Sequence, residues 1–526
     1  MKVGRAVLMA LLFSVNLLAS SQIVTSDITS NTLWNADTVY IDKSGFSVQS
    51  GVRLTIAPGT VVRFRGGLRF ITVKGTITAI GTVSDSISFA HENSQIVWQG
   101  IRLLKRNRTA GKDSSFFSYC KLAGAQCINT DSAYMVRGGA LYCGPGNYVG
   151  LSRSNLQSNV GSHGGAIYAD SGSDVRIEDC YFKSNTAEFF GGGAIMTNSG
   201  GPINLAVNSC RFDYNYARNG GAIRVGKGTS AEINSCIFYR DSTLSINPAL
   251  HDLQGGALAV FGPSDVVVKN SIFLFCRSYD KGGAIYSSDA ALKLINCTVA
   301  QSTALYGGGI YFAHTSEPSF PQLVNTIVSH NGVLWGIDLP RDSAGVAIYL
   351  DSAVSPSFRN CAISDTVYDH TIKPFNGNFE NSAYRVTSWA WEMRIDLSDT
   401  LVEGYNLDEY DKSIDAGTPD VSGFGLSEYD LAGKTRISGS AIDIGAFEYN
   451  GPVSISGYNP QIKESQLFGC SELVVYSLDG KRITMFKGTQ IPESVRDLRK
   501  KLPRGVYLLT ASRSGKKLGS RKFFVK

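Results

Sequence analysis

Charge and long apolar runs are both scarce in this chain of 526 residues. Charged residues make up only 18% of it, whereas hydrophobic residues make up 43%, which is ample for a core and excludes a disordered chain. Beyond residue 21 no stretch is long and apolar enough to cross a bilayer as a helix, so we expect no transmembrane span in the mature chain. No close Cys or His pairs show ligand spacing, so we expect no metal site and no cofactor.

Paired acidic residues of the kind that glycoside hydrolases need are missing as well. The chain contains no Asp-Asp pair, and His163, in Ser-His-Gly-Gly, is interpreted as a turn residue. One group of acidic residues is interpreted as part of a solvated loop and strand edge; it consists of Asp170, Asp174, Glu178 and Asp179. A second group is interpreted as a cap that closes the β-helix; it consists of Asp415, Asp420, Asp430, Asp443 and Glu448 with Arg436. We therefore assign no catalytic residue. The enzymatic alternative is a polysaccharide lyase or glycoside hydrolase, acting on an acidic or a plant or algal polysaccharide, whose site is assembled from distant coils.

The two ends of the chain differ from its body. Lys2 and Arg5 precede an apolar stretch, and small residues end at Ser21, so residues 1–21 are predicted to be a secretory signal peptide. Residues 496–526 hold eleven Lys and Arg and one acid. These basic residues alternate with strand-like apolar ones in a chain that we expect to be secreted, so we predict no nucleic-acid partner.

A Gly-Gly-Ala-Ile motif, or one close to it, recurs along the middle of the chain. Its first Gly falls at Gly138, Gly164, Gly192, Gly220, Gly255, Gly282 and Gly307. A unit of about 27 residues with short strands and no helical periodicity indicates a β-solenoid, and the regular Leu spacing of a leucine-rich repeat is absent. We predict an all-β fold, a right-handed parallel β-helix of about 15 coils. The paired Gly are expected at bends with positive φ.

Cysteines and asparagines recur in step with this motif. One Cys precedes an inward apolar residue in several units, and we predict a buried row of thiols rather than disulfides for Cys120, Cys180, Cys210, Cys236, Cys297 and Cys361. Any bridge among Cys127, Cys143, Cys276 and Cys470 stays open. Asparagines three residues after the apolar one are predicted to adopt left-handed geometry and to form a ladder; they are Asn159, Asn185, Asn215 and Asn331.

The residue after the Ile of the motif is expected to face outward. It is a tyrosine at Tyr142 and Tyr168, which would stack, and again at Tyr286 and Tyr311. Rows of aromatic rings suit sugar rings, although stacked tyrosines can also serve only to stabilise a sheet. Our leading hypothesis is a non-catalytic β-helix that binds glycans or surfaces in the manner of an adhesin. The other alternative is a purely structural surface protein.

The repeats also resemble those of a known family. The alternation of Gly-Gly-Ala-Ile with FKSN and FDYN, from Phe182 and Phe212, resembles the polymorphic outer-membrane proteins of chlamydiae over residues 136–335. That resemblance implies a β-helix linked to adhesion. Those proteins are autotransporters that end in a membrane β-barrel, and no amphipathic strands of that kind are recognised after residue 370, so the resemblance is confined to the repeats.

Two further segments resemble parts of secreted bacterial proteins. LTIAPGTVVRF near the start and DIGAFEY at 443–449 resemble the choice-of-anchor group of β-helix proteins. LVVYSLDGKRI, LPRGVYLLTASRSGKKL and the terminal RKFFVK resemble the sorting domain of the type IX secretion system. This second resemblance implies the translocon as a partner of residues 451–526, and a secreted protein that is extracellular or attached to the outer-membrane surface of a Gram-negative bacterium.

The domain organisation expected from these observations has four parts. Residues 1–21 form the signal peptide and 22–370 the β-helix. Residues 371–450 form irregular final coils and a cap, and 451–526 a small sorting domain resembling a β-sandwich.

Overall fold

The structure is a computed structural model, and it describes most of the β-helix and part of the C-terminal region. The described residues are 20–65, 70–92, 97–104, 114–127, 136–244, 252–316, 319–334, 347–363, 367–369, 379–380, 413–418, 420–449, 471–477, 482–487, 502, 505–513 and 516–525. The predicted signal peptide, except its last two residues, lies outside this part of the chain. So do Cys470 and most of residues 371–412. No helix among the described residues is long and apolar enough to cross a membrane.

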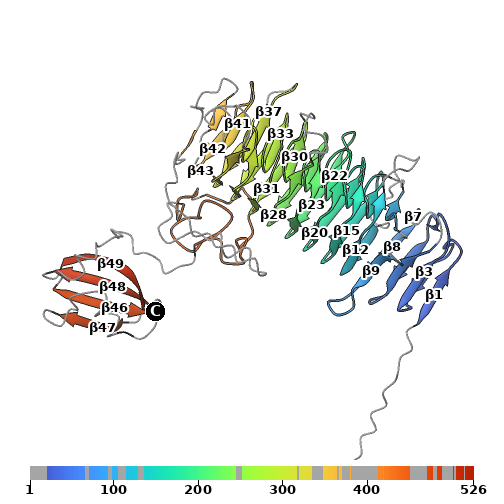
Figure 1. The fold of residues 1–526 in the computed structure, drawn as a ribbon, viewed down its shortest axis with the longest axis horizontal. Coiled ribbons are helices and arrows are strands. Elements are labelled where there is room, and N and C mark those ends of the chain that lie inside the picture. The colour runs from blue at the N-terminus through green and yellow to red at the C-terminus, as the bar shows by residue number, and fades with distance from the viewer. Residues whose placement is uncertain are drawn as a thin grey trace, which may run out of the picture. The chain divides into compact units, whose positions relative to one another are not determined.

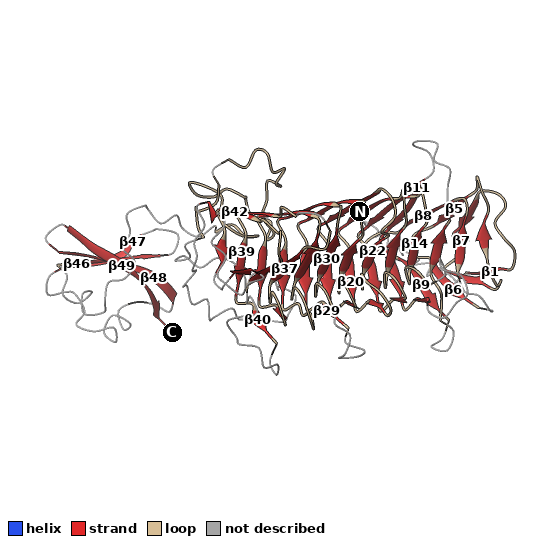
Figure 2. Ribbon diagram, turned by 90° about the horizontal axis from the view of Figure 1, so that it is seen from above, coloured by secondary structure: helices blue, strands red, loops and turns tan. Residues whose placement is uncertain are grey.

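The main body is a right-handed parallel β-helix built from three long parallel sheets, as predicted (Figures 1 and 2). Sheet A consists, in spatial order, of β1 (Ser21–Val24), β3 (Thr38–Ile41), β6 (Val61–Phe64), β9 (Ile87–His91), β12 (Cys120–Ala123), β16 (Asn155–Gln157), β20 (Tyr181–Lys183), β24 (Arg211–Asp213), β28 (Ile237–Tyr239), β32 (Ile272–Leu274), β35 (Thr298–Ala300), β39 (Ile327–Ser329) and β43 (Ala362–Ile363).

Sheet B consists of β4 (Ser47–Val48), β7 (Ile71–Val73), β10 (Ile101–Leu103), β14 (Leu141–Cys143), β18 (Ile167–Ala169), β22 (Ile195–Thr197), β26 (Ile223–Val225), β30 (Leu258–Phe261), β33 (Ile285–Ser288), β37 (Ile310–Ala313), β41 (Ile348–Leu350) and β44 (Val367–Asp369). Sheet C consists of β2 (Thr32–Trp34), β5 (Arg53–Ile56), β8 (Thr76–Ile80), β11 (Ser114–Ser118), β15 (Tyr148–Ser152), β19 (Asp174–Glu178), β23 (Ile203–Asn208), β27 (Thr229–Asn234), β31 (Asp265–Lys269), β34 (Ala291–Ile295), β38 (Gln322–Val324), β42 (Ser357–Arg359) and β45 (Phe379–Glu380).

A fourth row of very short strands, sheet D, lies between sheets A and B along the chain. It contains β13 (Gln126–Cys127), β17 (Val160–Gly161), β21 (Thr186–Ala187), β25 (Tyr216–Ala217) and β29 (Ser242–Thr243), then β36 (Thr303–Ala304) and β40 (Gly332–Val333). Isolated bridges from Ser242 to Arg277 and from Arg277 to Thr303 join the two groups. Sheets A and C hold 13 strands each, fewer than the 15 coils expected, because the described residues beyond β45 add no further strand to these sheets.

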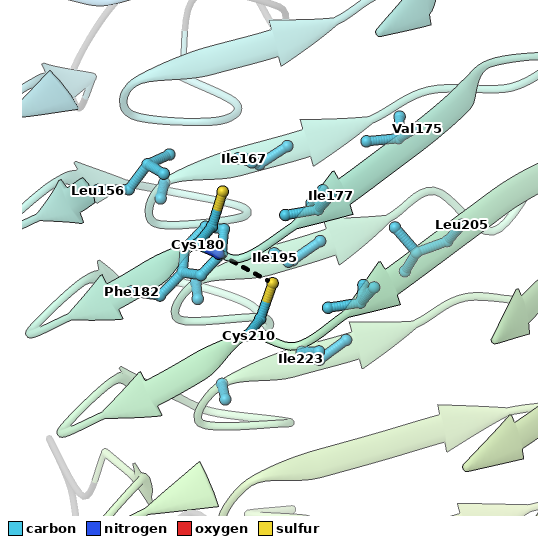
Figure 3. Packing of buried hydrophobic residues seen from close by; sticks show 14 of the residues in the cluster. Leu156, Ile167, Val175, Ile177, Cys180, Phe182, Ile195, Leu205, Cys210 and Ile223 are labelled. Carbon is cyan, nitrogen blue, oxygen red and sulfur yellow. Dashed lines mark hydrogen bonds between the residues drawn. The ribbon is translucent and has the colours of Figure 1, made fainter. Parts of the chain in front are cut away.

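Each strand pairs in register with the same strand of the next coil, so like residues stack on like residues. In sheet A the rings of Phe182, Phe212, Phe238 and Phe273 form one inward stack, with centroid separations of 4.9, 4.8 and 4.4 Å. Figure 3 shows part of the core that they share with the Ile and Leu of the other two sheets. The first Gly of each repeat motif has positive φ, as at Gly164 with φ +65°, which confirms the bend predicted there.

The predicted thiol row exists and is longer than the sequence suggested. All six of its cysteines are buried and unbridged, and Ser154, Ser271 and Thr326 occupy the same position in the coils that lack Cys. The backbone N–H of one coil donates to the side chain of the next, as from Cys180 to Cys210 Sγ at 3.4 Å (Figure 3). The Cys120 N–H donates to Ser154 Oγ at 2.9 Å in the same way. Burial raises the pKa of Cys120 to about 12, so its thiol stays protonated and unreactive.

The asparagine ladder is confirmed, but its predicted backbone geometry is wrong. Asn159 Nδ2 donates to Asn185 Oδ1 at 2.9 Å, and Asn185 Nδ2 donates to Asn215 Oδ1 at 3.0 Å. Positive φ belongs to the residue before each Asn, as at Ser158 and Ser184, because that residue makes the turn while the Asn side chain points inward. Cys276, one of the unassigned cysteines, takes the Asn position in its own coil and is a free thiol.

The C-terminal region contains one antiparallel sheet among its described residues. Its order is β47 (Arg482–Lys487), β46 (Glu472–Ser477), β48 (Gly505–Arg513) and β49 (Lys516–Val525). The strands fall where the sequence predicted them, whereas a second layer of the expected sandwich is not seen in the described part. Leu473 and Val475 are buried on one face of β46.

A stretch that follows the coils returns to their side. The returning segment comprises residues 420–431 and 444–446, which belong to the same compact unit as the β-helix. Lys269 Nζ donates to the Gly425 carbonyl at 3.1 Å, and the Gly445 N–H donates to the Asn325 carbonyl at 2.7 Å. Gly445 has φ +107°, a backbone conformation that residues with a Cβ rarely adopt, so this turn favours the glycine of DIGAFEY.

We expect the phenylalanine stack to be a main source of stability. Phe238→Ala removes a ring that lies between Phe212 and Phe273, so it should lower the free energy of unfolding by about 3–5 kcal/mol. Phe238→Leu, which keeps most of the volume, should cost clearly less. Urea denaturation of both variants measures this. Equal losses for Ala and Leu would contradict the role of the filled volume.

A second prediction concerns Asp241, which ends the ladder where another Asn would continue it. Its Oδ1 accepts from Asn215 Nδ2 at 2.9 Å, its Oδ2 has no hydrogen-bond partner among the described residues, and burial raises its pKa well above the usual value. The folded state therefore favours the protonated acid. The contribution of Asp241 to the free energy of unfolding is complete below the pKa of this group in the unfolded chain. It is lost as the pH rises toward the pKa in the folded chain.

Asp241→Asn should remove this loss and gain about 1–3 kcal/mol at alkaline pH, because its Nδ2 can donate where a carboxylate oxygen cannot. Urea midpoints of the two chains at about pH 5 and about pH 9 make the comparison. The difference between the urea midpoints of variant and parent should grow as the pH rises. A variant that is no more stable than the parent at the higher pH would refute the protonated state proposed for Asp241.

Candidate functional site

The four predicted tyrosines lie on the outer side of sheet B and stack in pairs. Tyr142 and Tyr168 pair in register with ring centroids 6.0 Å apart, and Tyr286 and Tyr311 do the same at 5.8 Å. Both pairs belong to small apolar clusters separate from the main core. The stacking predicted from the repeat is therefore confirmed.

These rings are nevertheless covered, because a second layer of side chains packs outside sheet B. The four side chains are 1–5% exposed. The Arg137 guanidinium lies 5.1 Å from the Tyr168 ring centroid, and the Lys281 ammonium lies 5.4 Å from that of Tyr311. The expectation of open ring faces is wrong for this reason. A binding role for these tyrosines stays a prediction, and a sugar would first have to displace the covering groups.

Asp170 is the hub of a buried network beside this tyrosine pair. Its Oδ2 accepts from the Tyr142 hydroxyl at 2.8 Å, and its Oδ1 accepts from Asn198 Nδ2 at 2.7 Å. Arg137 forms an ion pair with it at 3.7 Å. The expectation of a solvated Asp170 is wrong, because the carboxylate fixes the turn between sheets B and C.

The other three acids of that stretch lie near the surface, as predicted. Asp174 pairs with Arg176 at 3.3 Å, Asp179 pairs with Arg153 at 3.6 Å, and Glu178 is exposed at the end of β19. Among the described residues, no group of three or more His, Cys, Asp or Glu side chains is arranged to hold a metal ion.

His163 lies between two aromatic rings rather than beside a carboxylate. Its ring stacks on Phe190 at 5.0 Å and meets Tyr168 edge-on at 6.4 Å. Burial, and then the positive charges of Arg137 and Arg224, lower its pKa to about 4. The imidazole is therefore neutral near pH 7 and serves as a packing group, in agreement with the turn residue predicted.

The acidic residues near the end of the described chain bind backbone N–H groups. Asp443 accepts from the N–H groups of Asp415 and Tyr449, both at 2.6 Å, and Glu448 accepts from Ser438 at 3.0 Å. Asp443 and Glu448 are each 1% exposed, and burial raises their pKa values to about 6 and about 7. These carboxylates hold their own loop together and are closed to a substrate.

An exposed set of aromatic and basic side chains lies at the turn from sheet A to sheet D. We call it the aromatic–arginine strip, and it consists of Tyr214, Tyr216, Arg240, Phe275, Arg277 and Tyr279. These residues come from three consecutive coils, because β24, β28 and β32 are neighbours in sheet A. Arg240, Arg277 and Tyr279 are exposed and the others are half-buried. The repeat pattern gives no signal for this strip, although Tyr214 lies within the FDYN motif and Phe275 takes the same position two coils further on.

Tyr239 supports the strip from below. It is 2% exposed, and the rings of Tyr214 and Phe275 meet it edge-on at 5.7 and 5.9 Å. The Arg240 guanidinium lies 5.2 to 5.9 Å from the centroids of all three rings and donates to the Tyr214 hydroxyl at 3.3 Å. Arg277 lies over Tyr279 at 4.4 Å. The strip is thus a pre-ordered surface rather than a set of loose side chains.

The backbone under the strip is strained by its own residues. Tyr214, Arg240 and Phe275 have φ of 54–55°, in the left-handed region that bulky residues rarely adopt. The same turn in other coils is made by Gly124, Ser158, Ser184, Gln301 and His330, all with positive φ. The turn itself therefore does not require large side chains, and these three coils carry them at a conformational cost.

Comparison with known proteins agrees with the fold. The model of the family described as "Right handed beta helix region" matches residues 139–320 and 192–387. A protein of Escherichia coli (strain K12), named "Probable autotransporter YfaL", is 28% identical over 194 residues, which is 34% of this chain. The match spans only 15% of that protein.

A solved structure, the crystal structure of pectate lyase Pel9A, aligns with 83% of this chain and 98% of its own, at 16% identity and a TM-score of 0.38. That likeness carries no argument about activity. The family match and the sheet topology agree that this chain is a right-handed parallel β-helix.

The neutral state of His163 predicts an acid-sensitive fold around it. The pKa of His163 falls from about 6.5 in the unfolded chain to about 4 in the folded chain. Its contribution to the free energy of unfolding is therefore complete above pH 6.5 and is lost as the pH falls toward 4. His163→Gln cannot be protonated, so its unfolding temperature should fall less than that of the parent over this range. Thermal unfolding across the pH range tests this, and parallel profiles for the two chains would refute it.

Proposed function

We propose that this chain is a surface or secreted β-helix that contacts glycans and does not cleave them. The observation that carries the proposal is the aromatic–arginine strip, which offers ordered rings at the surface of three neighbouring coils. Rigid rings give contact area at small entropic cost, and their faces suit the apolar face of a sugar. Other coils make the same turn with Gly124, Ser158 or Ser184, so the fold does not require three large neighbouring residues there.

The proposed location follows from the two ends of the chain. The leader-like residues 1–21 indicate export, and residues 451–526 resemble a type IX sorting domain, whose partner would be the outer-membrane translocon. The match to an Escherichia coli protein named as a probable autotransporter is consistent with a surface location. We place the protein, as part of this proposal, outside a Gram-negative cell or on its outer-membrane surface.

Binding of the purified full-length chain to a glycan panel tests the proposal. Tyr214→Ser and Phe275→Ser install the residue that other coils carry in the same turn, so folding should be preserved. Each should weaken glycan binding about tenfold or more, since a truncated aromatic anchor removes most of its contact. Phe116→Ala is the control, because Phe116 is a 41% exposed aromatic residue on sheet C, outside the strip.

Two results would overturn the proposal. The first is that no glycan binds, or that binding is unaffected by both strip variants. The second is the release of unsaturated or reducing sugar from a polysaccharide, which would make the chain an enzyme.

A further inference from the structure

We propose that the ligand of the aromatic–arginine strip is an acidic polysaccharide whose carboxylates pair with Arg240 and Arg277. This inference rests on the proposed function, because it names the chemical class of glycan. Two features of the strip carry it, namely two guanidinium groups without acidic partners and their position beside the rings that would hold the sugars.

The strip holds positive charge that nearby acids do not offset. Neither Arg240 nor Arg277 forms a salt bridge with any residue that the structure describes. Asp213 is 3% exposed and already binds Arg211 through both oxygens at 2.9 Å. Asp241, next along the chain from Arg240, is fully buried, and its Oδ1 accepts from Asn215 Nδ2, so its carboxyl group does not face the strip.

Asp280, the acidic residue on the other side of the strip, is also buried. It follows Tyr279, but it is 6% exposed, and its backbone carbonyl accepts from the N–H groups of Leu305 and Tyr306. The exposed face of the strip therefore presents two cations to solvent, and complementarity of charge calls for an anionic ligand.

The guanidinium groups are oriented to bind a planar anion. Cation–π contacts to three rings, and one hydrogen bond to the Tyr214 hydroxyl, hold Arg240 in place. The remaining N–H groups of its fork are free to grip a carboxylate with two hydrogen bonds. Arg277 lies one coil further along, about 4.8 Å across the sheet, and pairs with Ser242, two residues after Arg240. A glycan that runs obliquely across the coils therefore meets one arginine and then the other.

A similar pair elsewhere on the molecule lacks this feature. Arg176 lies over Tyr148 at 5.5 Å on sheet C, yet it pairs with Asp174 at 3.3 Å. Arginines lie over rings at several other places in the described chain, and Arg65, Arg153 and Arg211 there pair with a carboxylate as Arg176 does. Arg240 and Arg277 are exposed and have no such partner among the described residues. This makes Arg176 a matched control for the experiment.

The experiment measures binding of the full-length chain to polygalacturonate and to its methyl ester, which differ in charge and share one sugar backbone. We expect the acid form to bind about tenfold more tightly or better, and the difference to shrink in high salt. Arg240→Gln installs the residue that Gln301 provides in the same turn, and it should weaken binding of the acid form about tenfold and leave the ester unchanged. Arg240→Lys should recover only part of the loss, and Arg176→Gln should have no effect.

The outcomes separate this inference from the proposed function. Equal binding of acid and ester, lost in Phe275→Ser, would overturn the inference and leave the proposed function standing. No binding of either form, or of any glycan in the panel, would overturn both. Dextran sulfate and single-stranded oligo-dT are the remaining arms, and tighter binding of either than of polygalacturonate would refute the assignment to carboxylates.

Discussion

In-register parallel pairing of each coil with the next is the constraint on which the rest of the structure depends. The backbone hydrogen bonds fix a spacing of about 4.8 Å, and every side chain must therefore tolerate its counterpart directly above and below. Apolar residues solve this by stacking, as the phenylalanines of sheet A do. Polar residues meet it by donating a hydrogen bond from each coil to the equivalent residue of the next coil. The asparagine ladder and the row of Cys, Ser and Thr both do this.

The same constraint explains how the outer surface can vary from coil to coil while the fold stays the same. Inward positions are fixed by stacking, whereas outward positions need only avoid a clash with their neighbours. The turn from sheet A to sheet D keeps one backbone geometry with Gly, Ser, Gln, Tyr, Arg or Phe. A local change of side chain over three coils therefore builds a surface of rings and guanidinium groups without altering the coil path.

Much of this architecture was readable from the sequence, since a stacked structure repeats its chemistry at a fixed interval. The Gly bends, the thiol row and the ladder follow directly from the motif. The predictions that failed concern side chains covered by a second layer of residues outside the sheet. Tyr142 and Tyr168 follow the Ile of the repeat and do point away from the core, yet Arg137 and His163 cover Tyr168 from a different part of the coil. No periodicity reveals such cover.

The candidate site was missed for a related reason. Tyr214, Arg240 and Phe275 are chemically unlike, so they break the repeat pattern that identified everything else, and only their shared turn brings them together. Likewise Asp241 stands in the Asn position of its coil, but its burial and its raised pKa depend on the packing around it. Repetition identifies what the coils have in common and hides what one group of coils does differently.

The returning segment has a consequence for how the rod comes apart. A solenoid whose coils touch only their neighbours can fray one coil at a time from an end. Here Lys269 and Asn325, from different coils, are both bound by residues that follow much later in the chain, with a separation of 156 residues between Lys269 and Gly425. The coils between them must therefore open together with the segment or not at all. This joins the last coils and the returning segment into a single cooperative unit, which is completed only when residues 420–446 have been made.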